Sequence, residues 1–171
     1  MKRFLMMFAA ATLFASAAAA QTPELKVDEV QTRGEELTGN TVAISGLCSH
    51  LCAHGGRRMF LRGAKTVFRV ESTKATGAFP SEVVNEPVRV VGVLKETRID
   101  ETYLRNWEER LISGSAGHDG CGTEVAARGD QGDTDRQKID NFRKRIAERN
   151  AKEGKNYLSV FYLTAESYEI L

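Results

Sequence analysis

This chain lacks three features: a long apolar run beyond its N-terminus, an excess of charge of one sign, and an even number of cysteines that could all form pairs. Beyond its first 20 residues no apolar stretch reaches the roughly 20 residues of a membrane span. The chain has 24 basic and 23 acidic residues, so it lacks the basic excess of a nucleic-acid binder, and we expect no nucleic acid among its partners. Its three cysteines cannot all pair within one chain. No Ser/His/Asp order or pair of carboxylates marks an active site, so we expect a binding protein rather than an enzyme.

The N-terminus has the three parts of a secretory signal peptide. Lys2 and Arg3 precede an apolar run over residues 4–14, and small residues follow as far as Ala20. We therefore expect residues 1–20 to be removed and the protein to be periplasmic or secreted. Removing these 20 residues from 171 leaves 151, a length typical of one domain, with 22 basic residues against 23 acidic ones.

Five short segments alternate apolar and polar residues in the way that half-buried strands do. They cover residues 41–47, 58–62, 66–71, 87–94 and 158–163, the last with a continuation considered as far as 170. Residues 21–40 look like a polar N-terminal arm.

An insertion at about residues 96–156 separates the fourth and fifth strands, and it is too long to be a plain loop. Its second half predicts a helix that begins at Asp133 or Thr134, carries apolar residues at helical spacing and ends at Gly154. Residues 103–112 fit either a second helix or a continuation of the fourth strand. Residues 113–133 are rich in Gly, Asp and Ser and predict an exposed loop.

The segments TVAISGL (41–47) and PVRVVGVL (87–94) and the ending YLSVFYLTAESYEIL (157–171) resemble small exported bacterial OB-fold proteins. The resemblance implies a mainly β fold, a five-stranded OB-like Greek-key barrel over residues 41–171 with a helical insertion between strands four and five. It covers most of the mature chain and implies almost nothing about function. OB domains often carry a helix between strands three and four, whereas residues 73–86 leave room for a turn or two only.

All the cysteines and histidines fall within two short windows, residues 48–54 and residues 118–121, and this clustering is the strongest signal in the sequence. Thiolates and imidazoles together are the ligands that zinc and copper prefer. We therefore predict a zinc or copper site formed by Cys48, His50, Cys52, His54, His118 and Cys121.

The predicted topology brings the two windows together, because in an OB barrel both connections flank one binding face. Four ligands such as Cys48, Cys52, His54 and Cys121 could then close a tetrahedral site. If the first window is extended, its alternate residues, from Cys48 to His54, would share one side of the strand. Met59 would add a soft donor that suits copper.

Three other interpretations stay open. Cys121 could form a structural disulfide with Cys48 or Cys52, and the histidines would then be ordinary loop residues. The cysteines could instead exchange disulfide partners in a thiol-redox role. The barrel could also bind an oligosaccharide, a peptide or another ligand, with strand aromatics such as Phe60 and Tyr162 available for stacking. Besides a metal ion, another exported or membrane protein is considered as a partner.

Overall fold

The computed structural model describes residues 22–52, 55–113 and 134–171. The predicted signal peptide, His54, His118 and Cys121 lie outside these ranges. None of the helices within them combines the length and apolarity needed to cross a membrane. The elements in chain order are β1 (Glu24–Lys26), η1 (Val27–Glu29), α1 (Val30–Leu37), β2 (Thr41–Leu51), β3 (Arg58–Arg62), β4 (Val67–Glu71), η2 (Ser81–Val83), β5 (Pro87–Ile99), α2 (Glu101–Ile112), α3 (Asp135–Glu153) and β6 (Leu158–Ile170).

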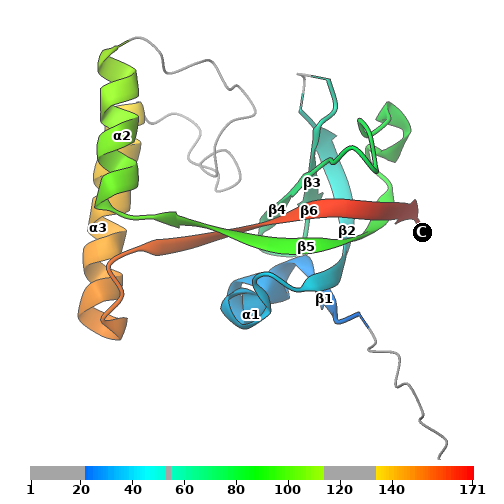
Figure 1. Cartoon of the computed structure of the whole chain (residues 1–171), viewed down its shortest axis with the longest axis horizontal. Coiled ribbons are helices and arrows are strands. Elements are labelled where there is room, and N and C mark those ends of the chain that lie inside the picture. Colours follow the sequence, from blue (N-terminus) through cyan, green and yellow to red (C-terminus); the bar gives the residue numbers. More distant parts are fainter. Residues whose placement is uncertain (1–21, 53–54, 114–133) are drawn as a thin grey trace, which may run out of the picture.

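Strands β2 to β6 form a closed barrel with the connectivity of an OB fold (Figure 1). The strand order is β1-β2-β3-β4-β6-β5, and a further pairing of β2 with β5 closes the barrel. β4 and β6 are parallel, whereas the other neighbours within the barrel are antiparallel. The predicted mainly β, OB-like barrel with a helical insertion between its fourth and fifth strands is confirmed.

Strand register determines which side chains fill the barrel. Met59 on β3 pairs with Val70 on β4, and Leu61 pairs with Phe68, and all four belong to the barrel core. Paired residues share a face of the sheet and neighbours along a strand alternate between faces. Phe60, between Met59 and Leu61, therefore lies on the outer face.

The segment expected to be a polar arm folds against the barrel instead. It forms β1, η1 and α1, and its apolar residues Leu25, Val27 and Val30 are almost fully buried in the barrel core. Within η1, the Asp28 carboxylate accepts hydrogen bonds from the backbone N–H groups of residues 64–66 and from the Thr66 hydroxyl, at 2.7 to 3.0 Å. Asp28 thereby fixes the β3–β4 turn, and these bonds hold its pKa below the ordinary value.

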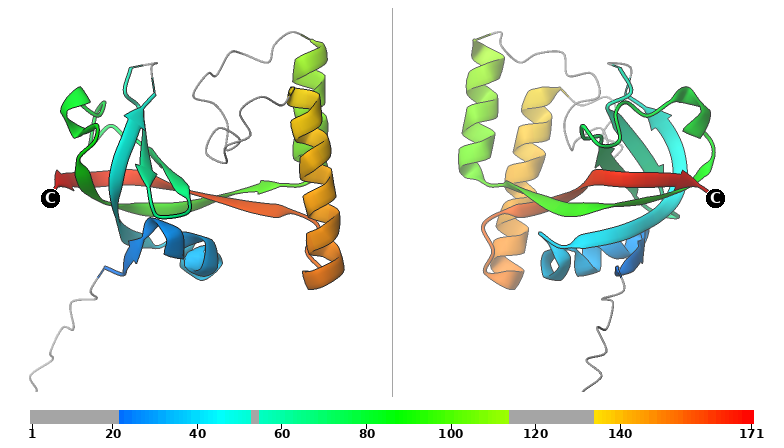
Figure 2. Two further views of the ribbon diagram at one scale, coloured as in Figure 1. Left: turned by 180° about the vertical axis from the view of Figure 1, so that it is seen from behind. Right: turned by 45° about the vertical axis from the view of Figure 1, so that its right-hand side comes forward.

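The two longest strands leave the barrel together and carry the insertion. β5 and β6 pair from Val88 and Ile170 to Ile99 and Leu158, so their outer halves form a two-stranded ribbon that ends at α2 and α3 (Figures 1 and 2). We call α2, α3 and this end of the ribbon the arm. The arm has a core of its own, which is separate from the barrel core and comprises Ile99, Leu104, Trp107, Ile139, Phe142, Leu158 and Val160.

Local signals define both helices of the arm. The Asp100 side chain accepts a hydrogen bond of 2.8 Å from the Tyr103 N–H and caps α2, which makes residues 101–112 a helix rather than a strand. Thr134 and Gln137 form a capping box at the start of α3. Gly154 ends α3 with φ of 68°, as predicted from the sequence.

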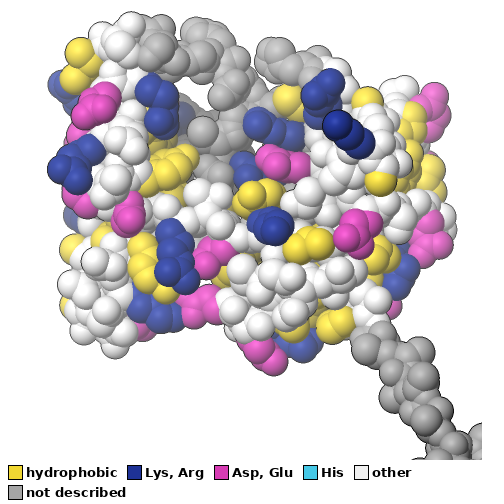
Figure 3. Space-filling view, viewed as in Figure 1, with side chains coloured by type: hydrophobic (Ala, Val, Ile, Leu, Met, Phe, Trp, Pro, Cys, Tyr) yellow, Lys and Arg dark blue, Asp and Glu magenta, His cyan; other side chains and the backbone are white. Residues whose placement is uncertain are grey.

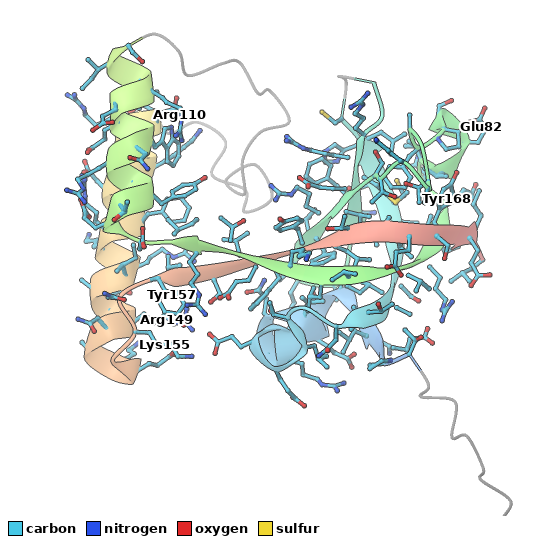
Figure 4. All side chains as sticks on the ribbon, viewed as in Figure 1. Glu82, Arg110, Arg149, Lys155, Tyr157 and Tyr168 are labelled. Carbon is cyan, nitrogen blue, oxygen red and sulfur yellow. The ribbon has the colours of Figure 1, made fainter. Side chains whose placement is uncertain are left out.

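A polar contact ties the arm to the barrel. Glu35 on α1 accepts hydrogen bonds from Arg149 Nη2 on α3 at 2.6 Å and from Lys155 Nζ at 2.5 Å, and Ser159 Oγ lies 3.3 Å away. Figure 4 shows Arg149, Lys155 and Tyr157 together where α3 turns into β6. These contacts hold the pKa of Glu35 at about 2, with the Lys155 and Arg149 hydrogen bonds as the main causes.

The ribbon divides the molecule into two sides. α1 lies on one side, whereas the end of β2, the start of β3, the end of α2 and the start of α3 lie on the other (Figures 1 and 2). On the face seen in Figure 3, Lys and Arg side chains are interspersed with Asp and Glu over both the arm and the barrel. This mixture agrees with the nearly equal numbers of basic and acidic residues in the chain.

Candidate metal centre

A β-bulge in the first Cys/His window decides where its side chains point. Cys48 pairs with Leu61 on β3, yet His50 pairs with the adjacent Phe60, so Ser49 is an extra residue in β2. Because Leu61 and Phe60 lie on opposite faces of the sheet, Cys48 and His50 do as well. The shared face expected for an extended segment does not hold between these two residues.

Cys48 belongs to the barrel interior. Its side chain is fully buried among the apolar residues of the barrel core, and its Sγ lies 3.9 Å from the His50 carbonyl oxygen. Burial raises the pKa of the Cys48 thiol, which opposes formation of the thiolate that binds metals. Met59, the additional soft donor considered for copper, is also fully buried in this core.

His50 is exposed on the outer face and is held by two neighbours. Its ring stacks on Phe60 with a centroid distance of 4.3 Å and an interplanar angle of 9°. Its Nδ1 lies 3.1 Å from Ser49 Oγ, and that hydroxyl donates to the Phe60 carbonyl oxygen at 3.0 Å. Together these contacts fix both the plane and the rotation of the imidazole.

The contacts of the Ser49 hydroxyl assign the histidine tautomer. A hydroxyl has one proton to donate, and with that proton assigned to the Phe60 carbonyl, Ser49 Oγ accepts a hydrogen bond from His50 Nδ1–H. In neutral histidine the other nitrogen, Nε2, then keeps its lone pair. Partial burial lowers the pKa of His50, which favours the neutral ring at neutral pH. His50 therefore presents an oriented Nε2 donor on the outer face.

Cys52 follows the end of β2 at the rim of the barrel. Its N–H donates to the Arg58 carbonyl oxygen at 2.9 Å, which carries the β2–β3 register one step beyond Leu51. This register places Cys52 on the face of the strand that His50 occupies, although its side chain is 7% exposed whereas His50 is exposed. Two residues apart on a strand, their Cα atoms are separated by about 7 Å, a spacing from which two side chains can reach one ion.

Gly56 connects the end of β2 with the loop around Phe79. The Cys52 carbonyl accepts a hydrogen bond from Gly56 N–H at 3.2 Å, and the Gly56 carbonyl accepts one from Phe79 N–H at 2.9 Å. Gly56 has φ of 63°, and a Cβ there would lie 2.6 Å from the Phe79 carbonyl oxygen. Only glycine fits this position.

The remaining predicted donors, His54, His118 and Cys121, lie outside the described residues, so the six-residue site stays a prediction. Within the described ranges, no three His, Cys, Asp or Glu side chains are grouped as a metal site would require. Cys48 and Cys52 are not bonded to each other. The end of α2 and the start of α3 lie on the same side of the ribbon as the end of β2 (Figures 1 and 2).

The sequence interpretation missed the roles of Ser49 and Phe60 in holding His50. Phe60 was considered as an aromatic available for stacking a ligand, and Ser49 had no expected role. A bulge depends on pairing with the neighbouring strand, so no local pattern indicated it.

Comparisons with known proteins identify no family for this chain. No protein-family model and no curated protein matches it. Among solved structures, asparaginyl-tRNA synthetase from Pyrococcus horikoshii, complexed with asparaginyl-adenylate, is 13% identical, with a TM-score of 0.41, over 86% of this chain and 22% of that one. A putative aspartyl-tRNA synthetase from Leishmania major Friedlin is 20% identical, with a TM-score of 0.36, over 54% of this chain and 20% of that one. The chain thus spans about a fifth of these proteins, and at such low identities and TM-scores we draw no function from them.

Proposed function

We propose that this protein binds one zinc or copper ion on the outer face of its barrel, through His50 Nε2 and Cys52 Sγ. The remaining ligands would come from His54, His118 and Cys121. The observation that carries the proposal is the Ser49 hydroxyl, which holds His50 in the tautomer and orientation of a metal ligand. Metal-binding histidines commonly have their second ring nitrogen held in this way. Cys48 is left out because its thiol lies in the core.

The length of the insertion is compatible with a shared site. Cys121 lies eight positions after Ser113 in the sequence, and an extended chain covers about 26 Å in eight steps, close to the diameter of a small domain. The insertion also starts and ends on the side of the ribbon where the rim with Cys52 lies. This reach is the basis on which we propose that donors from the second window join His50 and Cys52.

A small ion suits this face better than a stacking ligand does. Phe60 is 3% exposed and Arg69, which lies over the Tyr162 ring at 4.6 Å, is 9% exposed. Buried side chains offer little surface on which a sugar or a base could stack. The redox alternative is weakened as well, because Cys48 and Cys52 lie on opposite faces of the sheet and a direct bridge between them would distort β2.

The proposal includes the expected location. With residues 1–20 removed, the protein would act in the periplasm or outside the cell as a binding protein rather than an enzyme. Its partners would be the metal ion and another exported or membrane protein that supplies or receives it.

Metal uptake by the reduced mature chain tests the proposal. The protein is incubated with zinc or with Cu(I) under anaerobic conditions, desalted, and measured by elemental analysis and native mass spectrometry. We expect one ion per chain. His50→Gln and Cys52→Ala should abolish or strongly weaken binding, whereas the matched variant Cys48→Ala should keep the stoichiometry.

A second pair of variants isolates the positioning role of Ser49. Ser49→Ala should lower metal affinity by about 10- to 100-fold, the range typical of groups that hold a metal-binding histidine. Ser45→Ala removes a hydroxyl elsewhere on β2, 3.2 Å from Glu24, and should leave the affinity unchanged. A reduced, folded protein that takes up neither metal would refute the proposal. Loss of metal in Cys48→Ala but not in Cys52→Ala would refute the assignment of the two faces.

A further inference from the structure

Five of the seven cations of α3 fall into two groups. Arg143 is held by Glu101 and Glu108 of α2, both at 2.8 Å, and Arg149 is held by Glu35 and Glu153 at 2.6 and 3.0 Å. Lys138, Lys144 and Arg145 instead line a hollow of about 180 Å³ on the same helix. Within the described residues no carboxylate pairs with Lys144 or Arg145, and Lys138 has only the exposed Asp135 at 3.6 Å. The first group stabilises the fold, whereas among the described residues the second group has no strong ion pair and lines a hollow instead.

From this second group we infer that the hollow on α3 is a binding site for a phosphate group. Its charged lining consists of three cations and one carboxylate, Glu148, and Asn141 and Phe142 complete it. The excess of positive charge favours an anion. At about 180 Å³ the hollow is smaller than the roughly 300–1,000 Å³ of ligand pockets. It therefore suits one oxyanion group rather than a whole nucleotide or cofactor.

Arg145 is placed to recognise a tetrahedral oxyanion. Its guanidinium lies over the Phe142 ring at 5.7 Å from the centroid, and Phe142 is anchored in the arm core. A cation held over an aromatic face has fewer conformations to lose on binding. The fork of guanidinium donors matches two oxygens of a phosphate group. Lys138, half-buried two helical turns earlier, supplies a second charge from the other end of the hollow.

The test uses the metal-free mature protein, so its result is independent of the metal proposal. Inorganic phosphate is titrated while backbone and Arg side-chain NMR signals are followed. We expect saturable shifts confined to the middle of α3. Arg145→Gln and Lys138→Gln should each weaken binding about tenfold, as expected when a hydrogen-bonded charge is removed. Glu148→Gln should tighten binding about threefold, because it removes the repelling carboxylate.

A matched variant separates this site from general surface charge. Lys152 is exposed in the last turn of α3 and does not line the hollow, so Lys152→Gln should leave phosphate binding unchanged. Phosphatidylcholine vesicles with and without phosphatidic acid show the source of the group. Binding to these vesicles but not to free phosphate identifies a lipid headgroup, and the reverse identifies a soluble phosphate. Binding to neither, or equal losses in Lys152→Gln and Arg145→Gln, would overturn the inference.

Discussion

The contact between Glu35 and the arm gives the sharpest prediction about stability. Glu35→Gln keeps the shape of the side chain and removes the charge that Arg149 and Lys155 contact. The barrel core and the arm core are separate clusters, so this contact is a principal side-chain link between them, besides the ribbon itself. We expect the variant to fold and to be less stable than the wild type.

The size of the loss follows from the pKa of Glu35. A fall from 4.5 to about 2 would correspond in full to roughly 3 kcal/mol of stability. The Glu35 side chain is 42% exposed, however, and water screens exposed ion pairs strongly. We therefore expect Glu35→Gln to lower the free energy of unfolding by about 1 kcal/mol at neutral pH.

The sign of the pH dependence is fixed as well. The pKa of Glu35 is lower in the folded state, so its contribution is complete above about pH 4.5 and is lost as the pH falls from there towards 2. Urea denaturation at several pH values between 7 and 3 measures the free energy of unfolding of the wild type and of Glu35→Gln. The difference in this free energy between the two proteins should shrink by more than half from pH 7 to pH 3.

A neighbouring residue provides the control. Glu36 is exposed on the same helix and makes no hydrogen bond or ion pair with other described residues, so Glu36→Gln should change the free energy of unfolding by less than about 0.5 kcal/mol. Equal effects of the two substitutions at pH 7, or a Glu35→Gln deficit that stays constant down to pH 3, would show that the contact contributes nothing specific.

Three further substitutions test other parts of the fold. Asp28→Asn leaves a single acceptor oxygen for four hydrogen bonds, so hydrogen exchange of the amides at residues 64–66 should become faster, whereas unchanged exchange would contradict the role of Asp28. Cys48→Ser places a hydroxyl in the barrel core and should lower the free energy of unfolding by about 1–3 kcal/mol, more than Cys48→Ala does, as measured by urea denaturation. Gly92→Ala would bring a Cβ to 2.2 Å from the Thr164 carbonyl oxygen. The substitution should therefore lower the melting temperature markedly and lower the free energy of unfolding by about 2 kcal/mol or more. A variant as stable as the wild type would mean that β5 and β6 separate easily at this position.

The alternation of apolar and polar residues was sufficient to predict the barrel strands, but not the ribbon or the N-terminal segment that packs on the barrel. It located all five barrel strands because each has one face in the core. It ended the fourth strand at Leu94, whereas β5 continues to Ile99. Residues 95–98 are polar because they lie in the ribbon beyond the barrel, where hydrogen bonds to β6 rather than burial of alternate residues maintain the strand.

The N-terminal segment escaped prediction for a related reason. Leu25, Val27, Val30 and Leu37 follow neither helical nor strand spacing over their whole length, because they belong to β1, η1 and α1 in turn. Each element is too short to show a period of its own. Its place in the fold comes from contact with the barrel, which no window of the sequence reveals.

The geometry of the candidate site could not be predicted from the sequence, and its metal chemistry stays a proposal. The clustering of thiols and imidazoles indicated a metal, but simple alternation grouped Cys48 with His50 and Cys52. A regular β2 would have placed all three towards the core along with Leu61. The extra residue at position 49 lets Cys48 fill the barrel while His50 turns outwards, and Cys52 follows on the same face of the strand as His50 but is 7% exposed.

The residue inserted at the bulge has a consequence beyond this change of face. Any extra residue would turn His50 outwards, since the change depends on the register and not on the side chain. A serine adds a hydroxyl whose single proton is taken by the Phe60 carbonyl, so its oxygen accepts from Nδ1 of the adjacent histidine. Position 49 therefore has two separate effects. The bulge exposes the imidazole of His50, and the Ser49 hydroxyl leaves Nε2 as the nitrogen that can donate its lone pair to a metal.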